Sequence, residues 1–277
     1  MVTVDAILDA LELEPVGSDR YRAVNVVSGH EVVFGGQLLA QALVAGGQGH
    51  DEKTVKTLHT VFARAASPDQ PLEISVERIH TGRALASSTV TISQGDRLCT
   101  RSMVLLSAEE PDLIRHADRP VMLAAPPDES EPSVAEWTVR VVDDVDVSDP
   151  DEVGPPELDV WTRFPGAPDD QRRSQALVAF ATDGFLIGTA MRPHSGVGQA
   201  QAHRTISTGV LSHTLTFHEP FDASEWLLLS HRSTYAGHGR SYGRGDIYRT
   251  DGQLVASFVQ DGMIRAMPPK SAPRPSI

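Results

Sequence analysis

The sequence predicts an α+β fold in which one structural unit, a helix wrapped by a curved antiparallel sheet, occurs twice in tandem. In each half, a run with helical spacing is followed by strand-like runs separated by turn residues, which is typical of an antiparallel meander rather than of a parallel sheet. The order of these elements repeats, and short motifs recur at matching places in the two halves. These observations predict two helix-and-sheet units in one chain.

The composition indicates a globular cytoplasmic protein. With 277 residues, of which 40% are hydrophobic, the chain can bury a substantial core. A formal net charge of −13, without a dense run of Lys or Arg, argues against binding to nucleic acid or to a membrane surface. Cys99 is the single cysteine, which excludes an internal disulfide and a cysteine-based metal cluster and suits a reducing compartment. The acidic start does not resemble a signal peptide, and no uncharged apolar run reaches the roughly 18 residues of a membrane span.

The first half begins with two helices and a strand between them. Apolar spacing predicts a helix over Asp5–Leu13, and alternation predicts a strand over Tyr21–Val27. Residues 32–47 predict a second helix with one apolar face, closed by Gly46 and Gly47 as its C-cap. Strand-like runs separated by turn-forming residues follow at 57–64, 71–80, 85–94 and 97–108.

Residues 109–158 differ in kind, because they are rich in Pro, Asp and Glu. This composition predicts an extended acidic connection that contains one strand, at Trp137–Val142. We therefore predict an N-terminal unit over residues 1–108, the connection over 109–158, a C-terminal unit over 159–267 and a disordered Pro-rich tail over 268–277.

The second half repeats the pattern of the first. A strand is expected at Asp159–Phe164, and Ser174–Met191 predicts one buried helix because Leu177, Phe180 and Ile187 recur at helical spacing. We expect each central helix to lie in the concavity of its own sheet. Further strand-like runs occupy residues 213–221, 225–234, 242–250 and 253–265.

Matched motifs make the repeat specific. Phe34-Gly-Gly-Gln37 corresponds to Phe180-Ala-Thr-Asp183, and Thr60-Val-Phe62 corresponds to Leu215-Thr-Phe217. Arg78 and Arg232 follow 16 and 15 residues after the latter pair of motifs, and Gly82-Arg83 corresponds to Gly239-Arg240. The identities are sparse, so chance similarity between two α+β halves is the alternative interpretation.

Asp183 falls on or beside the apolar face of the predicted second-half helix. An unpaired buried charge costs several kcal/mol, so this carboxylate needs either a hydrogen-bonded partner or a function. One interpretation is an N-cap that starts a short helix at Gly184. The other is a catalytic carboxylate whose pKa is raised by burial, and we favour it because of the motifs that follow.

Three runs carry a family resemblance. VVFGGQLLAQAL, FHEPFDASEWLLL and DGQLVASFVQDGMIR closely resemble the acyl-CoA thioesterase II (TesB-like) family, whose members are double hotdog proteins, and they occur in the family's order and spacing. The resemblance implies hydrolysis of acyl-CoA to a free fatty acid and coenzyme A, with no cofactor and no metal. It further implies that an Asp on the second hotdog helix, a Ser or Thr before the FHxPF strand and a Gln on the last strand hold the attacking water. The Asp corresponds to Asp183 and the Gln to Gln260.

The hydroxyl position of the family does not correspond cleanly. It falls on Val210, and valine cannot hold a water molecule. Thr208 and Ser212 lie two residues to either side, and a spacing of two in a strand keeps side chains on one face. We therefore expect Thr208 or Ser212 to substitute, or the third hydrogen bond to be absent.

Residue chemistry supports the same site. Thioester hydrolysis needs a base for water, a group that orients the water and donors for the developing oxyanion. Gln260 carries both a donor and an acceptor, and it alternates with Phe258 and Ala256, so we expect it to point inward. The backbone N–H of Gly184 is our candidate donor to the thioester carbonyl. Taken alone, Gln260 is better explained as an ordinary amide at a strand end, and the other motifs carry its functional interpretation.

Residues 236–245, AGHGRSYGRG, are the candidate site for the phosphates of coenzyme A. Arg240 or Arg244, together with backbone N–H groups, would bind the 3′-phosphate or the diphosphate. The alternative interpretation is a glycine-rich turn. The run is not GxGxxG, and GxSxG is absent, so neither a dinucleotide fold nor a serine hydrolase is indicated.

Two other functions compete with thioester hydrolysis. A hydratase or dehydratase of hotdog architecture would need a catalytic His near Asp183, and His194 is the candidate nearest in sequence. A non-catalytic acyl-CoA binding protein is favoured by Val210. We interpret His59 and His213 as structural, and no HExxH spacing indicates a metal. Because hotdog units usually associate through sheet edges, we expect a homo-oligomer, a dimer or larger.

Overall fold

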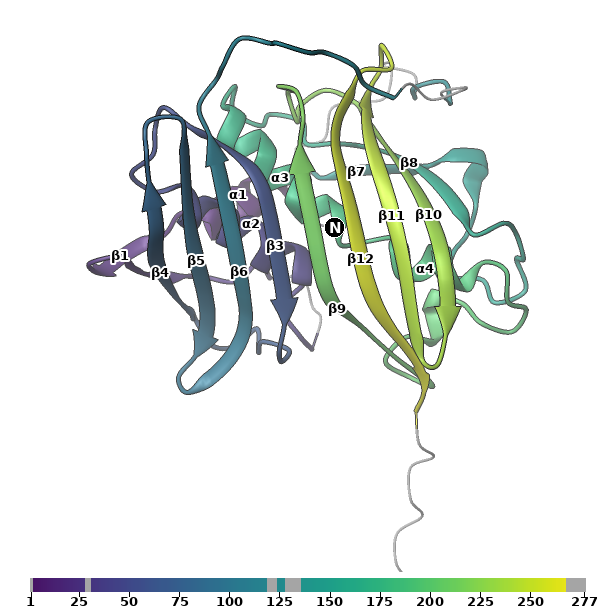
Figure 1. Cartoon of the computed structure of the whole chain (residues 1–277). Coiled ribbons are helices and arrows are strands. Elements are labelled where there is room, and N and C mark those ends of the chain that lie inside the picture. Colours follow the sequence, from purple (N-terminus) through teal and green to yellow (C-terminus); the bar gives the residue numbers. More distant parts are fainter. Residues whose placement is uncertain (1, 28–30, 119–123, 128–135, 268–277) are drawn as a thin grey trace, which may run out of the picture.

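The computed structural model describes residues 2–27, 31–118, 124–127 and 136–267, which form one continuous twelve-stranded sheet curved around its helices (Figure 1). The strand order is β1-β2-β4-β5-β6-β3-β9-β12-β11-β10-β8-β7, and all neighbouring strands in it are antiparallel. The predicted α+β class with an antiparallel sheet is confirmed. The two halves do not form separate sheets, because β3 pairs with β9 at the centre.

The first half contains two helices and six strands. They are α1 (Val4–Leu11), β1 (Glu14–Gly17), β2 (Arg20–Ala23), α2 (Gly35–Gly47), β3 (Thr54–Phe62), β4 (Leu72–Thr81), β5 (Leu85–Gln94) and β6 (Arg97–Ser107). The strand expected over Tyr21–Val27 is shorter than predicted. The hairpin partner β1 was missed, because all four of its residues are exposed and it therefore lacks the apolar alternation of a half-buried strand.

The second half follows the same plan with a different helical layer. Its elements are β7 (Thr138–Val141), a 3₁₀ turn η1 (Val142–Asp144), β8 (Glu157–Arg163), α3 (Gln171–Thr182), α4 (Leu186–Met191), a 3₁₀ turn η2 (Gln199–Gln201), β9 (Ile206–Phe217), β10 (Leu227–Gly237), β11 (Arg240–Arg249) and β12 (Leu254–Ala266). The expected strand within the acidic connection is β7, which pairs with β8. The tail predicted over residues 268–277 lies outside the described residues.

The strand order is symmetric about the β3–β9 pair. On one side β3 is followed by β6, β5, β4, β2 and β1, and on the other side β9 is followed by their counterparts β12, β11, β10, β8 and β7. Across the central seam, His59 lies opposite Thr214, the residue that the motif alignment gives as its equivalent. Phe34 and Phe180, also equivalent, pack edge to face with ring centroids 5.0 Å apart. The repeat therefore corresponds to an approximate two-fold axis that passes through these two pairs.

The prediction of one helix over Ser174–Met191 is wrong, because the segment forms α3 and α4 with a break at 183–185. Thr182 donates its hydroxyl to Ala179 O at 3.0 Å, and the Gly184 N–H tightens the last turn by donating to Ala181 O at 3.3 Å. Phe185 has φ of −123°, outside the helical range. The poor helix propensity of Gly184 allows the break, and it turns Asp183 into the C-cap of α3.

Helix α2 is buried between the sheet and α3, and its C-terminus differs from the prediction. Gly46 and Gly47 are helical residues and Gln48 is the C-cap. A Cβ on Gly46 would lie 2.6 Å from Val104 Cγ2, so this glycine permits close packing on β6 rather than a helix stop. Among the described residues, no helix combines the length and the apolar character needed to cross a bilayer.

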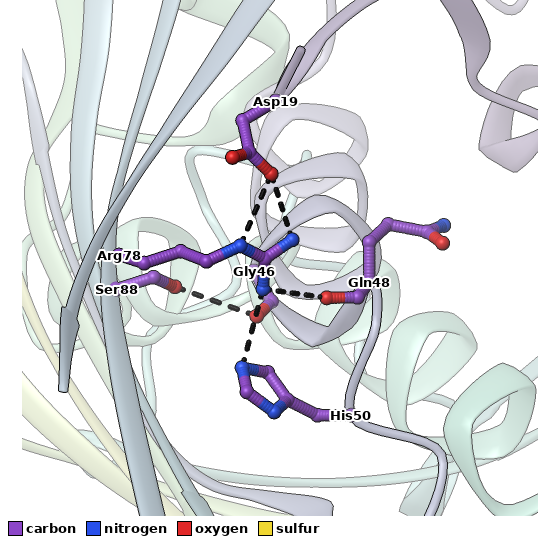
Figure 2. A network of polar contacts seen from close by, with 6 residues as sticks. All are labelled: Asp19, Gly46, Gln48, His50, Arg78 and Ser88. Atoms are coloured by element: carbon purple, nitrogen blue, oxygen red, sulfur yellow. Dashed lines mark hydrogen bonds and ion pairs between the residues drawn. The ribbon is translucent and has the colours of Figure 1, made fainter. Parts of the chain in front are cut away.

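Arg78 on β4 holds the C-terminal end of α2 (Figure 2). Its Nη1 donates to Gln48 O at 2.9 Å and to His50 Nε2 at 3.2 Å, while its Nε and Nη2 donate to Asp19 Oδ1 at 3.1 and 2.7 Å. A cation at this end of a helix meets carbonyl oxygens that lack intrahelical partners. Arg78 therefore ties the sheet to the helix that starts at the candidate site.

Candidate active site

The candidate site lies at the break between α3 and α4, beside the N-terminus of α2. Asp183 Oδ2 accepts a hydrogen bond of 3.1 Å from the Gly36 N–H. Its Oδ1 is fully buried and has no hydrogen-bond partner among the described residues. The N-cap interpretation is wrong, because Asp183 ends α3 and the N-cap of α4 is Phe185. One carboxylate oxygen of Asp183 is therefore fixed by a hydrogen bond, and the other has no hydrogen-bond partner among the described residues.

Burial determines the electrostatics of Asp183. Desolvation raises the pKa of this carboxyl from 3.8 to about 7, and the hydrogen bond from Gly36 offsets part of the rise. The carboxyl also faces the positive end of the α2 dipole. A Cβ on Gly35 would lie 2.7 Å from Asp183 Oδ2, so the glycine lets the carboxyl rest against the first turn of α2. The direction of this pKa shift is the one that the sequence predicted.

Gln260 lies on β12, between β9 and β11, and its side chain points inward as predicted, with 2% of the residue exposed. Its Oε1 lies 3.0 Å from His213 Nδ1, and its Nε2 is buried without a partner among the described residues. On β11 the residue opposite is Gly243, where a Cβ would lie 2.7 Å from the side chain of Leu186 on α4. Gln260 therefore faces the start of α4, three residues after Asp183.

His213 and Thr182 complete the polar network, and the sequence did not identify either as functional. His213 Nε2 lies 3.1 Å from Thr182 Oγ1, and both residues are completely buried. Burial lowers the pKa of His213 to about 4, so the ring is neutral near pH 7. The repeat contained a usable indication: the motif alignment places His213 at the position of Leu58, and a change from Leu to His at a core position is a candidate functional change.

The structure corrects the prediction for Ser212. A β-bulge interrupts the pairing, because Asp261 lies opposite Ser212 whereas the next residue, Gly262, lies opposite Val210. Directly opposite residues share a face, so Ser212 lies on the outer face, where its hydroxyl donates to Asp261 Oδ2 at 2.8 Å. Thr208 shares the inner face with Val210 but lies opposite Ile264, farther along the strand. Because the bulge adds one residue, a spacing of two does not keep Ser212 and Val210 on the same face.

The Gly184 prediction is also corrected, since its N–H already donates to Ala181 O at 3.3 Å. The helix-terminal N–H beside Asp183 belongs to Gly36 of the other half, and it donates to Asp183 itself.

The structure does not bring Arg244 to the site. Gly243 and Gly245 face inward, against Leu186 and Phe258, so Arg244 between them faces outward. Arg240 follows a two-residue turn whose His238 and Gly239 have φ of 52° and 72°, as a type I′ hairpin requires. The glycines of this run are therefore explained by a turn and by close packing. Arg240 is exposed and donates to Gly239 O at 3.0 Å.

The first half lacks the same set of groups. Gln37, the counterpart of Asp183, accepts from the Val26 N–H at 2.9 Å and donates to Asn25 Oδ1 at 3.0 Å, so its side chain is engaged within the fold. Leu58 is the counterpart of His213, and it lies opposite Val104 as His213 lies opposite Gln260. Both apolar residues are at most 1% exposed. The polar pair His213 and Gln260 and the apolar pair Leu58 and Val104 therefore occupy equivalent places in the two halves.

Family models and known proteins show which family the two halves of this chain resemble. Residues 25–107 match the family model described as acyl-CoA thioesterase N-terminal domain, and residues 115–264 match the acyl-CoA thioesterase C-terminal domain. The human acyl-coenzyme A thioesterase 8 is 27% identical over 93% of this chain and 88% of its own length. The acyl-CoA thioesterase 2 of Haemophilus influenzae is 28% identical, with 94% and 96% covered.

Solved structures give the same result. The acyl-CoA thioesterase II TesB2 of Mycobacterium marinum superposes with a TM-score of 0.78 at 29% identity, covering 98% of this chain and all of the other. A hot dog fold protein of Alicyclobacillus acidocaldarius superposes at 0.72 with 21% identity over 95% and 98% of the two chains, which bears on the fold alone. The predicted double hotdog fold is confirmed.

Proposed function

The chain belongs to the acyl-CoA thioesterase family, and from this premise we propose that it hydrolyses acyl-CoA thioesters with a water molecule activated by Asp183. The observation that carries the assignment is the pair of buried, unpartnered atoms Asp183 Oδ1 and Gln260 Nε2. Buried polar atoms without a partner are costly, and of the nine found among the described side chains these two lie beside the same helix break, which indicates a place where water and substrate bind.

Asp183 is the general base in this proposal. A carboxyl with a pKa of about 7 is substantially ionised at neutral pH and is far more basic than an exposed aspartate. Asp183 Oδ1 takes a proton from the water as the water oxygen bonds to the thioester carbonyl carbon. The carbon–sulfur bond then breaks, the acid is released, and the proton passes to the departing thiolate of coenzyme A. No cofactor is needed for this balance.

Gln260 orients the water. Its Nε2 carries two N–H donors, and one of them can hold the water oxygen while Asp183 accepts the water's proton. The Gly36 N–H fixes Oδ2 of the base, so that Oδ1 is the oxygen left to react. Holding the nucleophile in one orientation lowers the barrier because the entropy of positioning is lost on binding rather than during reaction.

Hydration or dehydration is less well supported. A hotdog dehydratase would need an imidazole that reaches the substrate, whereas His213 has both ring nitrogens within hydrogen-bond distance of Thr182 and Gln260. His194 is exposed beyond the end of α4. A non-catalytic acyl-CoA binder is favoured only by Val210, and release of free thiol from acyl-CoA separates that function from hydrolysis.

The decisive test replaces the base and the water-orienting amide. Asp183→Asn keeps the size of the side chain but removes the proton acceptor, so kcat should fall about 10²- to 10⁴-fold. Gln260→Ala should also lose activity, and because both groups act on one water, the double variant should be little worse than Asp183→Asn alone. The assay is release of free thiol across a panel of acyl chain lengths.

Asp261→Asn is the matched control, because Asp261 neighbours Gln260 on β12 but is exposed on the outer face. It should retain parent activity. If Asp183→Asn hydrolyses acyl-CoA at the parent rate and melts several degrees lower, Asp183 is a structural cap and the assignment is wrong.

Binding of the nucleotide end of coenzyme A is proposed for Arg240. The support is its exposed guanidinium at the hairpin end, beyond Gln260 along the neighbouring strand. Arg240→Ala should raise KM for acyl-CoA more than for an acyl-pantetheine ester, which lacks the nucleotide phosphates. Arg244→Ala is the control, because Arg244 lies on the same outer face of β11 but four residues away from the hairpin end. Equal effects on the two substrates would contradict a phosphate-binding role for Arg240.

Self-association and a cytoplasmic location remain predictions. The first rests on the habit of hotdog units to pair through sheet edges, of which β1 and β7 are the outer ones here. Light scattering coupled to size-exclusion chromatography measures it directly. The second rests on the single cysteine, which suits a reducing compartment.

A further inference from the structure

We propose that His213 is a positioning residue, which fixes the side-chain amide of Gln260 so that its N–H donors, and not its oxygen, face the base, and that Thr182 fixes His213 in turn. This inference rests on the proposed function, because it assigns a role to groups that act through Gln260. It concerns three side chains that are 0%, 0% and 2% exposed and that form an unbroken chain of hydrogen bonds: Thr182, His213 and Gln260.

The hydrogen bonds follow from the chemistry of each group. Gln260 Oε1 can only accept, so His213 Nδ1, 3.0 Å away, carries the ring proton. A neutral imidazole with its proton on Nδ1 can only accept at Nε2. The group 3.1 Å from Nε2 is the Thr182 hydroxyl, whose single proton therefore has two acceptors, His213 Nε2 and Ala179 O. With the ring proton on Nδ1, the Thr182 hydroxyl shares its proton between His213 Nε2 and Ala179 O.

The consequence for Gln260 is chemical. An amide that rotates by half a turn exchanges oxygen and nitrogen at nearly the same places. If Oε1 faced the base, two acceptors would confront each other, and the water would lose its donor. His213 Nδ1–H prevents that rotation because a rotated amide would present N–H to N–H. Thr182 also immediately precedes Asp183, so the same chain is anchored beside the base.

The fold itself does not require this polar chain. At the equivalent place in the first half, Leu58 and Val104 occupy the cross-strand positions of His213 and Gln260, and they are 0% and 1% exposed. The counterpart of Thr182 is Gly36. The same architecture is therefore stable with two aliphatic side chains at this point. Three buried polar groups kept at a place that tolerates apolar ones indicate a functional role rather than a packing role.

The test replaces His213 by leucine, the residue that its counterpart Leu58 has in the first half. His213→Leu should lower kcat about tenfold to a hundredfold, by analogy with the loss of groups that orient metal-binding side chains, with KM unchanged and thermal stability held or raised. His213→Asn should recover most of the loss, because Asn Nδ2 can occupy the place of Nδ1 and donate to Gln260 Oε1. In a Gln260→Ala background, His213→Leu should have no further effect on kcat.

Thr182→Val is a second, independent variant of similar volume, which keeps the proposal testable if His213→Leu does not fold. It should lower kcat severalfold without a change in KM, and only when Gln260 is present. Losses that multiply with Gln260→Ala, or equal losses in His213→Leu and His213→Asn, would overturn the positioning role. Full activity in Asp183→Asn and Gln260→Ala would instead overturn the proposed function, which makes the two failures distinguishable.

Discussion

The Asp183 carboxyl makes a pH-dependent contribution to folding because burial raises its pKa from 3.8 to about 7. Below pH 3.8 the group is neutral in both the folded and the unfolded chain. Between 3.8 and 7 the unfolded chain releases the proton while the folded chain keeps it, so the free energy of unfolding decreases by about 1.4 kcal/mol per pH unit. Above pH 7 the cost is constant.

We therefore predict that Asp183→Asn is stabilised relative to the parent by more at pH 8 than at pH 5, as measured by urea unfolding. His213 and His231 have pKa values lowered to about 4 by burial, so their contributions are present above pH 6.5 and are lost as pH falls toward 4. Both proteins share that loss, so it cancels in the comparison. An advantage that is the same at both pH values would mean that Asp183 is not ionised on unfolding in this range.

Substitutions at the adjacent residues Gly35 and Gly36 should separate an effect on activity from an effect on stability. A Cβ on Gly36 would lie 2.1 Å from Phe180 O, and a backbone carbonyl at a helix crossing cannot give way, so Gly36→Ala should destabilise the protein by about 1–3 kcal/mol or more. A Cβ on Gly35 would lie 2.7 Å from Asp183 Oδ2, at the end of a side chain that can shift by rotation. Gly35→Ala should therefore lower kcat more than it lowers the melting temperature. Thiol-release kinetics and thermal unfolding of both variants test this contrast.

For the candidate site, the sequence predicted the burial of Asp183 and Gln260 better than the contacts around them. Asp183 and Gln260 were identified from the family motif, and the inward direction of Gln260 followed from alternation along β12. Ser212 was misplaced because a bulge of one residue reverses the face of a strand and leaves no mark in the sequence pattern. Gly36 was not identified as the donor to Asp183, because a contact across 147 positions depends on how the two helices cross.

At the scale of elements, the end of α2 is held by Arg78, which makes hydrogen bonds to the helix C-terminus and an ion pair with Asp19 (Figure 2). Its side chain is 33% exposed, so the ion pair alone contributes little and the bonds to the helix end contribute more. Arg78→Ala should lower the free energy of unfolding by about 1–2 kcal/mol.

Arg232, the counterpart of Arg78, is the matched control. It lies 3.6 Å from Glu157 with 58% of its side chain exposed, and surface pairs of this kind contribute about 0–1 kcal/mol. Urea unfolding of Arg78→Ala and Arg232→Ala gives the comparison, and equal destabilisation by the two substitutions would exclude a special role for the helix end.

The observed element boundaries match the boundaries predicted from the sequence where one periodicity, the alternation of a strand, is clear. Strands β4 to β6 and β10 to β12 lie within a few residues of their predicted positions, because alternating apolar residues and turn residues mark them. The α3–α4 region was predicted as one helix, since its apolar spacing continues through the break at Asp183. Helical spacing reports which residues are buried, and the backbone can interrupt the helix without disturbing that pattern.

At the scale of the whole molecule, the two halves are joined both by the sheet and by the site. The β3–β9 seam makes one sheet from two units, and Asp183 in the second half accepts a hydrogen bond from the first turn of α2 in the first half. The motif alignment anticipated the paired architecture but not the continuous sheet. Strand pairing between halves depends on which edges are free after each half has folded, and no local pattern specifies it.

The position of β12 in the sheet has a consequence for how the protein is made. Among the described strands β12 is synthesised after all the others, yet it lies between β9 and β11 and carries Gln260. Until it arrives, β9 and β11 each present an unpaired edge, which can pair with the edge of another chain. A polypeptide that stops before Leu254 lacks the proposed water-orienting residue and leaves two strand edges unpaired, so we expect it to be both inactive and prone to aggregate.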